Sequence, residues 1–256
     1  AAAQELEARA VDPSSGQKQV FATFTAVARD GGSPPEPTQG PADFIEDFEY
    51  QSVAAMLSGE NYIDYELKGG ENLSIIEDGY GGSNAVRSTW PASYSGETRL
   101  PLDIRRSSGW PGEWWIEYWF RIGSGWSMVD VESWKFMAVV SEGHSWRLEF
   151  SNGSDSRGLD QYIAAPYQYN ADAHRSMGQL RGTGWHRMRV HFSNTGAGHF
   201  DVQIDEDRVV KMRFEPQSGE VYYFSPTGLN RNNGGSGTFS NDVSHLRGYF
   251  SDPDWS

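Results

Sequence analysis

The sequence predicts an all-β fold, a sandwich of two antiparallel sheets that follows an extended N-terminal arm. Three observations indicate this class. Apolar and polar residues alternate along short segments, turn-forming residues separate those segments, and no long helical period of apolar residues occurs. The composition agrees, because 14% of the residues are aromatic and the chain holds 29 glycines and 12 prolines. At 256 residues, one large sandwich can bury a core without disulfides.

The segment 114–122 shows the clearest alternation. One set of its side chains is wholly apolar: Trp114, Ile116, Tyr118, Phe120 and Ile122. The opposite set mixes two indoles with charges: Trp115, Glu117, Trp119 and Arg121. Because alternate residues of a strand point to opposite faces of its sheet, the first set is expected in the core and the second in solvent.

Further strands are expected on the same grounds over 134–140, 146–150, 185–192, 200–204, 209–214, 221–224 and 243–250. The nearly continuous apolar run at 134–140 predicts a central strand. The acidic turn at 205–207 predicts a hairpin between the strands on either side of it. In 185–192, the alternation places Arg187, Arg189 and His191 on the outward face.

The chain is expected to divide into an arm with a Pro/Gly-rich linker, residues 1–41, and a jelly-roll domain, residues 42–256. Within the arm, residues 4–10 predict a short helical turn, residues 20–27 a strand, and residues 31–37 a stiff linker. A strand in an arm can add to the edge of a sheet, either its own or a neighbour's. Assembly with neighbouring subunits is therefore one hypothesis.

The formal net charge of −14 argues against nucleic acid and against an anionic membrane surface as partners. The chain has no cysteine, which removes disulfides and thiolate–metal sites from consideration. No run of about 18 apolar residues occurs, so no membrane span is expected. The expected location is extracellular, or exposed on a cell or virion surface.

Several short motifs follow one another in a recognisable order. They are Asp47-Phe48-Glu49, Trp185-His186-Arg187, Asn194-Thr195-Gly196, the Asp-rich hairpin at 201–207, Gly234-Gly235 and Asn241-Asp242-Val243. In this order they resemble the jelly-roll polysaccharide lyases that cleave alginate and glucuronan, together with their non-catalytic relatives. The resemblance covers residues 43–256. It implies a concanavalin A-like jelly roll of two antiparallel sheets. It also implies that the protein acts on polysaccharides or recognises them.

The chain also departs from the lyase pattern. Ser133-Trp134-Lys135-Phe136 replaces a Gly-Lys-Leu segment, and no Gln-Ile-His strand is present. Tyr223-Phe224-Ser225 lacks the lysine of the lyases' Tyr-Phe-Lys motif. These departures weaken the expectation of catalysis more than the expectation of the fold.

Lyase chemistry would need a cation to stabilise the uronate, a base for the C5 proton and an acid for the leaving oxygen. The catalytic candidates, if the protein is an enzyme, are Arg187, His191, Tyr223 and Lys135. Arg187, Arg189 and His191 form a cationic stripe that suits an anionic ligand. The alternative for the stripe is a solvated strand face paired with neighbouring carboxylates.

Glycan contact is expected on the outward face of the strands. Indole rings stack on sugars, and Trp115 and Trp119 share one face because four residues separate them. The candidates for glycan binding are Trp115, Trp119, Arg187, Arg189, Asn230 and Arg231. The alternative is that a second layer covers the two indoles.

No cofactor is expected apart from a structural Ca²⁺, for which Glu49 and Asp242 are the candidate ligands near the two ends of the domain. The six histidines show no zinc spacing along the sequence. Two functions stay open. The preferred one is a non-catalytic, glycan-recognising decoration module, and the other is a secreted lyase that cleaves a uronate-containing polysaccharide.

Overall fold

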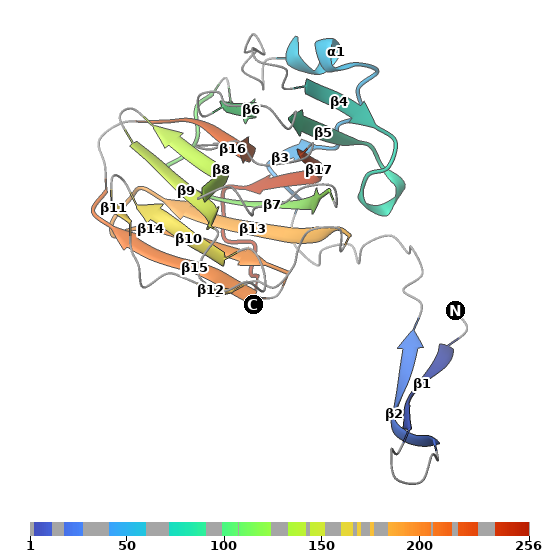
Figure 1. Ribbon diagram of the computed structural model, residues 1–256. Helices are drawn as coiled ribbons and strands as arrows, with labels where there is room; N and C mark the ends of the chain where they lie inside the picture. Colours follow the sequence, from blue (N-terminus) through green and yellow to red (C-terminus); the bar gives the residue numbers. More distant parts are fainter. Residues whose placement is uncertain are drawn as a thin grey trace. The chain divides into compact units, whose positions relative to one another are not determined.

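Two antiparallel β-sheets packed face to face form the larger unit of the chain in the computed structural model (Figure 1). The structure describes residues 3–11, 18–27, 41–59, 72–90, 99–106, 108–123, 133–141, 144–151, 160–165, 168–169, 175–176, 184–205, 207–216, 220–229 and 239–255. This architecture confirms the predicted all-β sandwich.

The eight-stranded sheet carries the surface on which the candidate site lies. Across it run β15 (Asp207–Phe214), β14 (Gly198–Ile204), β13 (His186–Ser193), β7 (Glu113–Ile122), β17 (Phe239–Tyr249), β5 (Ala85–Trp90) and β4 (Asn72–Ile76). The short β3 (Phe44–Glu46) also pairs with β17. The predicted hairpin at 205–207 is confirmed, because β14 and β15 pair antiparallel on either side of it.

The seven-stranded sheet forms the second layer. Its strands run in the order β11 (Gln168–Tyr169), β10 (Asp160–Ala165), β9 (His144–Ser151), β8 (Ser133–Ser141), β16 (Val221–Leu229) and β6 (Arg99–Ile104), while β12 (Arg175–Ser176) pairs with β10. The apolar run at 134–140 lies in β8, which is central as predicted.

Helical structure is scarce in the part of the chain that the structure describes. It amounts to α1 (Val53–Leu57) and the 3₁₀ turn η1 (Tyr80–Gly82). The side chain of Ser52 caps α1 by accepting the Ala55 N–H at 3.1 Å. Neither described helical segment is long and apolar enough to cross a membrane.

The core lies between the two sheets, and β7 supplies its centre. All five side chains that the alternation predicts to be buried are completely inaccessible to solvent: Trp114, Ile116, Tyr118, Phe120 and Ile122. Aromatic contacts join the sheets, since Trp114 lies 5.8 Å from Phe224 and Phe120 lies 5.0 Å from Phe136 between ring centroids. Burial of one such side chain contributes about 1.5–3 kcal/mol, so the five side chains of this strand contribute strongly to the packing.

The N-terminal residues Ala1–Pro37 form a separate unit from Thr38–Ser256. Within the first unit, β1 (Ala3–Val11) pairs antiparallel with β2 (Lys18–Val27). The strand expected at 20–27 is confirmed, whereas the helical turn expected at 4–10 is wrong. The Ala-, Glu- and Leu-rich composition of that segment favours a helix only weakly, and pairing with the aromatic and β-branched β2 outweighs it. The linker expected at 31–37 lies outside the described residues.

Candidate functional site

Three neighbouring strands, β7, β13 and β14, present their outward side chains in rows across the eight-stranded sheet. In one row Trp115 lies opposite His191, which lies opposite Asp201. In the next row Arg189 lies opposite Glu117 on one side and opposite Gln203 on the other. Directly opposed side chains are about 4.5–5.5 Å apart at Cβ, so the rows form one continuous polar and aromatic surface.

An open pocket of about 290 Å³ lies over these rows. Its lining consists of Trp115, Arg189, His191, Asp201, Gln203, Asp252, Asp254 and Trp255. The last three residues belong to the C-terminal segment, which therefore forms one wall. Arg189 joins this wall to the sheet, because its Nε donates to Glu117 at 2.6 Å and its guanidinium carbon lies 5.3 Å from the centroid of the Trp255 ring.

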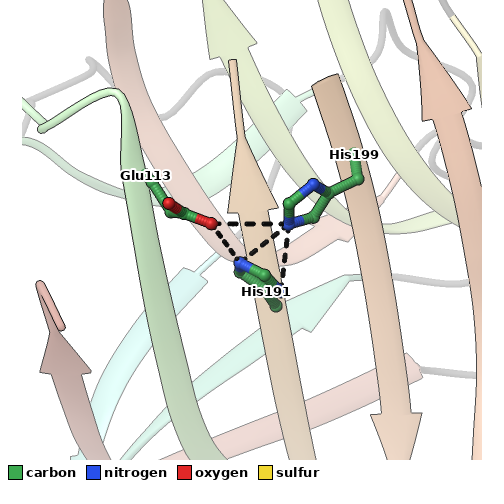
Figure 2. A group of neighbouring side chains, drawn as sticks. All are labelled: Glu113, His191 and His199. Carbon is green, nitrogen blue, oxygen red and sulfur yellow. Dashed lines mark hydrogen bonds and ion pairs between the residues drawn. The ribbon is translucent and has the colours of Figure 1, made fainter. Parts of the chain in front are cut away.

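A second group of side chains, Glu113, His191 and His199, meets at the end of the same surface. They come from β7, β13 and β14 and point toward one another, as Figure 2 shows. His191 Nε2 lies 2.9 Å from Glu113 Oε1 and 2.8 Å from His199 Nε2. His199 Nε2 lies 3.6 Å from the same Glu113 oxygen. We call these three residues the His–His–Glu cluster.

Burial and stacking fix the central histidine of the cluster. The imidazole of His191 stacks on the indole of Trp115, with ring centroids 4.3 Å apart and planes 10° from parallel. Burial lowers the pKa of His191, an effect that the hydrogen bond to Glu113 opposes and the neighbouring His199 reinforces. The neutral imidazole is thus favoured at neutral pH, which leaves a ring nitrogen able to accept a hydrogen bond or bind a metal.

The indoles predicted to contact glycan in solvent are covered. Trp115 is only 8% exposed and lies under His191. Trp119 stacks against Tyr80 of η1, with ring centroids 3.5 Å apart and planes 9° from parallel. The expectation of a solvent-facing surface on β7 is therefore wrong at these positions. The alternative of a second covering layer describes Trp119, which η1 covers, whereas Trp115 packs against His191 of β13, the neighbouring strand in the same sheet.

The predicted cationic stripe of Arg187, Arg189 and His191 lies on one face of β13, but a carboxylate neutralises part of it. Glu117 on β7 is 2.6 Å from Arg189 Nε and 4.0 Å from Arg187 Nε. Glu117 is itself only 8% exposed. The pairing with a neighbouring carboxylate agrees with the alternative that the sequence left open, but the two arginines are largely buried instead of solvated and hold β7 to β13.

The four catalytic candidates do not converge. Arg187 and His191 lie on β13 of the eight-stranded sheet, whereas Tyr223 lies on β16 and Lys135 on β8 of the other sheet. Phe224 points into the core, so Tyr223 points to the outer face of its sheet. Residues on the outer faces of two packed sheets cannot act on one sugar. The side chain of Lys135 lies outside the described residues.

The two calcium candidates have other partners. Asp242 is buried, and both of its carboxylate oxygens accept from arginines, Arg87 at 2.7 and 2.9 Å and Arg121 at 2.8 and 2.9 Å. Glu49 accepts from the backbone and the side-chain amide of Asn84. Guanidinium groups thus already bind both oxygens of Asp242, and calcium binding by these residues stays a prediction. The glycan candidates Asn230 and Arg231 lie outside the described residues.

Sequence reasoning missed several residues of this surface: Glu113, His199, Trp255, Asp201, Gln203, Asp252 and Asp254. Glu113 and His199 leave a signal in the sequence once the strand register is known. Ser193 of β13 pairs with His199 of β14 across the turn that follows it. On the other side of β13, Ser193 pairs with Glu113 of β7. His191 is two residues from Ser193 and so shares its face. Trp255 leaves no such signal, because it follows the last strand and its position depends on tertiary packing.

Comparison with known proteins places the fold. No protein-family model matches the chain, and no curated protein matches it in sequence. Solved structures do match. An endo-β-1,4-glucuronan lyase from the fungus Trichoderma reesei is 15% identical with a TM-score of 0.57, over 84% of this chain and 100% of that one.

Two other solved structures have a similar fold. The alginate lyase Aly36B, solved in complex with an alginate trisaccharide, is 14% identical with a TM-score of 0.58, over 82% of this chain and 98% of that one. The cellulose-induced protein Cip1 is 10% identical with a TM-score of 0.51, over 82% and 98% of the two chains. The chain therefore has the concanavalin A-like jelly-roll fold that its resemblance to these lyases implied.

Proposed function

We propose that the protein is a non-catalytic, glycan-recognising module that works outside the cell or on the surface of a cell or virion. The observation that carries this proposal is the open pocket beside Trp255. An indole that is partly exposed there offers an apolar face to a sugar ring. Gln203 and three aspartates offer donors and acceptors for sugar hydroxyl groups around the same space.

The charge of the lining favours a neutral glycan over a polyuronate. Asp252 and Asp254 carry negative charge, Asp201 is paired with Arg213 at 2.9 Å, and Arg189 is the one lysine or arginine among the described lining residues. That arginine is already paired with Glu117 at 2.6 Å. A polyuronate would bring further carboxylates toward these aspartates, and like charges at close range repel each other. A hydroxyl-rich neutral sugar meets no such cost.

The separation of the catalytic candidates supports a non-catalytic role. Elimination on a uronate requires a stabilising cation, a base and an acid around one sugar residue. Arg187 and His191 lie in one sheet and Tyr223 in the other. In addition, Arg187 lies close to Glu117 and Trp119, and His191 is bound by Glu113. These side chains serve packing and hydrogen bonding within the sheet.

A polysaccharide lyase is the second candidate, and the fold similarity favours it. The similar structures include lyases of glucuronan and alginate. In this alternative, the reaction would take place on the outer face of the seven-stranded sheet, where the half-buried Tyr223 lies on β16 beside β8. Lys135 belongs to β8 and would then supply the cation.

Binding assays with matched variants distinguish the two candidates. The full chain would be screened for retention in native gels that contain neutral polysaccharides, alginate or glucuronan. Trp255→Ala is expected to weaken retention by a neutral glycan about tenfold, since an aromatic contact contributes about 0.5–1.5 kcal/mol beyond its buried area. Tyr222→Ala is the control, because Tyr222 is 51% exposed on the other sheet.

The same preparations would be incubated with alginate and glucuronan while the absorbance of the unsaturated product is followed. We expect no change in absorbance. New absorbance that disappears in Tyr223→Phe would overturn the non-catalytic proposal in favour of the lyase. Binding that survives Trp255→Ala but is lost in Tyr222→Ala would move the glycan to the seven-stranded sheet and would overturn the pocket beside Trp255 as its binding site.

A further inference from the structure

We propose that the His–His–Glu cluster is a binding site for a divalent transition-metal ion of the zinc class, with Glu113, His191 and His199 as its protein ligands. Two imidazole nitrogens and one carboxylate oxygen are a donor set that zinc accepts, with water or another ligand in the fourth position. Calcium and magnesium prefer oxygen ligands, so the two histidines select against them.

The distances within the cluster match what a zinc ion requires. Bonds of about 2.0–2.1 Å in a tetrahedral site place two ligand atoms roughly 3.3 Å apart. In this structure the three separations are 2.8 Å between the two Nε2 atoms, 2.9 Å from His191 Nε2 to Glu113 Oε1 and 3.6 Å from His199 Nε2 to that oxygen. Small side-chain rotations that move each ligand atom by a few tenths of an ångström would bring the three separations to the tetrahedral value.

Hydrogen bonding prepares one ligand for the metal. His199 Nδ1 lies 3.4 Å from the carbonyl oxygen of Ala197, and a carbonyl only accepts, so Nδ1 carries the hydrogen. The neutral ring then has its lone pair at Nε2, the atom that faces the other two ligands. A zinc-bound histidine usually donates a hydrogen bond of this kind from its non-ligating nitrogen.

The sheet itself holds the other two ligands in place. The indole of Trp115 fixes the plane of the His191 ring by stacking on it, 4.3 Å away between centroids. Glu113, His191 and His199 come from three adjacent strands, so the backbone ladder fixes their spacing. Their side chains are 42%, 23% and 17% exposed, respectively, which leaves an ion room to enter and keep a water ligand. On binding, the hydrogen of His191 would lie at Nδ1, which leaves Nε2 for the metal.

Metal binding by the tag-free full chain tests the proposal without any glycan, so its result does not depend on the proposed function. We expect one equivalent of Zn²⁺ per chain in titration calorimetry, and with Co²⁺ the visible absorption of a four-coordinate site. His199→Ala and Glu113→Gln should each weaken Zn²⁺ binding by more than about tenfold, the smallest loss usual for partners of a metal site.

His186→Ala is the matched control, because His186 lies on the same strand as His191 and binds Asp205 on the opposite face. This variant should bind Zn²⁺ like the unaltered chain. Thermal unfolding with and without Zn²⁺ provides a second measure, since a ligand that binds the native state raises the midpoint. No binding at all, or binding that survives both His199→Ala and Glu113→Gln, would show that the cluster is only a hydrogen-bonded group of side chains.

Discussion

Trp115 and His191 stack as parallel rings on the outer face of the eight-stranded sheet, 4.3 Å apart between centroids. This contact joins the two halves of the candidate surface, because both residues line the pocket and His191 also belongs to the His–His–Glu cluster. An indole that the alternation places outward is thus only 8% exposed. The outer face of β7 is therefore a second, smaller packing layer.

Loss of the Trp115 ring should destabilise the domain. We expect Trp115→Ala to lower the free energy of unfolding by about 3 kcal/mol. This value is at the lower end for truncation of a large buried aromatic residue, because Trp115 borders the open pocket. Urea denaturation followed by tryptophan fluorescence measures the change. Tyr222→Ala removes an aromatic ring that is 51% exposed and should change stability by less than about 0.5 kcal/mol. Equal effects of the two substitutions would contradict the packing role.

The carboxylate of Asp242 should be important for stability. Its side chain is 3% exposed and binds Arg87 and Arg121, so Asp242→Asn removes the carboxylate partner of Arg87 and leaves Arg121 with the more exposed Asp78. We expect a loss of roughly 3 kcal/mol, the low end for a broken buried ion pair, because both arginines keep some access to solvent. Asp201→Asn is the control, since its partner Arg213 is half exposed, and it should cost less than about 1 kcal/mol.

Calcium provides a second test of the Asp242 site. Because arginines occupy both carboxylate oxygens, added Ca²⁺ should leave the thermal midpoint of the unaltered chain unchanged. A rise of the midpoint with Ca²⁺ that disappears in Asp242→Asn would instead support the calcium site expected from the sequence.

The stability of the β13–β14 hairpin should depend on pH through Asp205. Burial raises the pKa of Asp205, but the hydrogen bond with His186 and the N–H that Arg187 donates outweigh it, so the pKa lies below the ordinary value of an aspartate. A carboxyl group with a lowered native pKa stabilises the fold above its unfolded pKa and loses that contribution as the pH falls through its folded pKa. The contribution should be under about 1 kcal/mol, because Asp205 is half exposed.

Urea denaturation of the unaltered chain and of Asp205→Asn at a series of pH values measures this contribution. The difference in unfolding free energy should be largest near neutral pH and should vanish in acid, below the ordinary range of aspartate. A difference that stays constant down to the lowest pH would mean that the side chain acts by packing alone.

Alternation along single strands predicted the buried half of the fold. A strand such as β7 can bury only one of its two faces against the other sheet, so the apolar set from Trp114 to Ile122 identifies the core without further information. The same rule does not tell what lies over the opposite face. Tyr80, which covers Trp119, comes from η1, and its approach depends on the path of the chain between strands.

The candidate site was harder to predict, because alternation does not assign a strand to a sheet. Arg187 and Tyr223 both face outward on their strands, but β13 and β16 belong to different sheets. The pairing of His191 with His199 depends on register, which the turn after Ser193 sets. Only a register that pairs Ser193 with His199 places both histidines on one face, and a shift by one residue would turn His199 toward the core.

Assembly through the N-terminal unit is the last expectation. A two-stranded sheet is marginally stable by itself in water, and each of its outer edges presents unpaired N–H and C=O groups. β1 and β2 form such a sheet within Ala1–Pro37. We therefore propose that the unit pairs with a sheet of another subunit. Deletion of residues 1–37 should convert the assembled protein to a monomer in analytical ultracentrifugation.

The deletion should leave the sandwich intact, with a thermal midpoint within about 2 °C of the full chain, equivalent to less than ~1 kcal/mol. Phe24→Pro is a point variant with the same purpose, because proline removes a ladder hydrogen bond from β2 opposite Leu6. It should weaken assembly while the sandwich, a separate unit, unfolds at the same temperature. Two outcomes would contradict a role of β1 and β2 in assembly. The full chain could be monomeric, or the truncated chain could assemble as well as the full chain does.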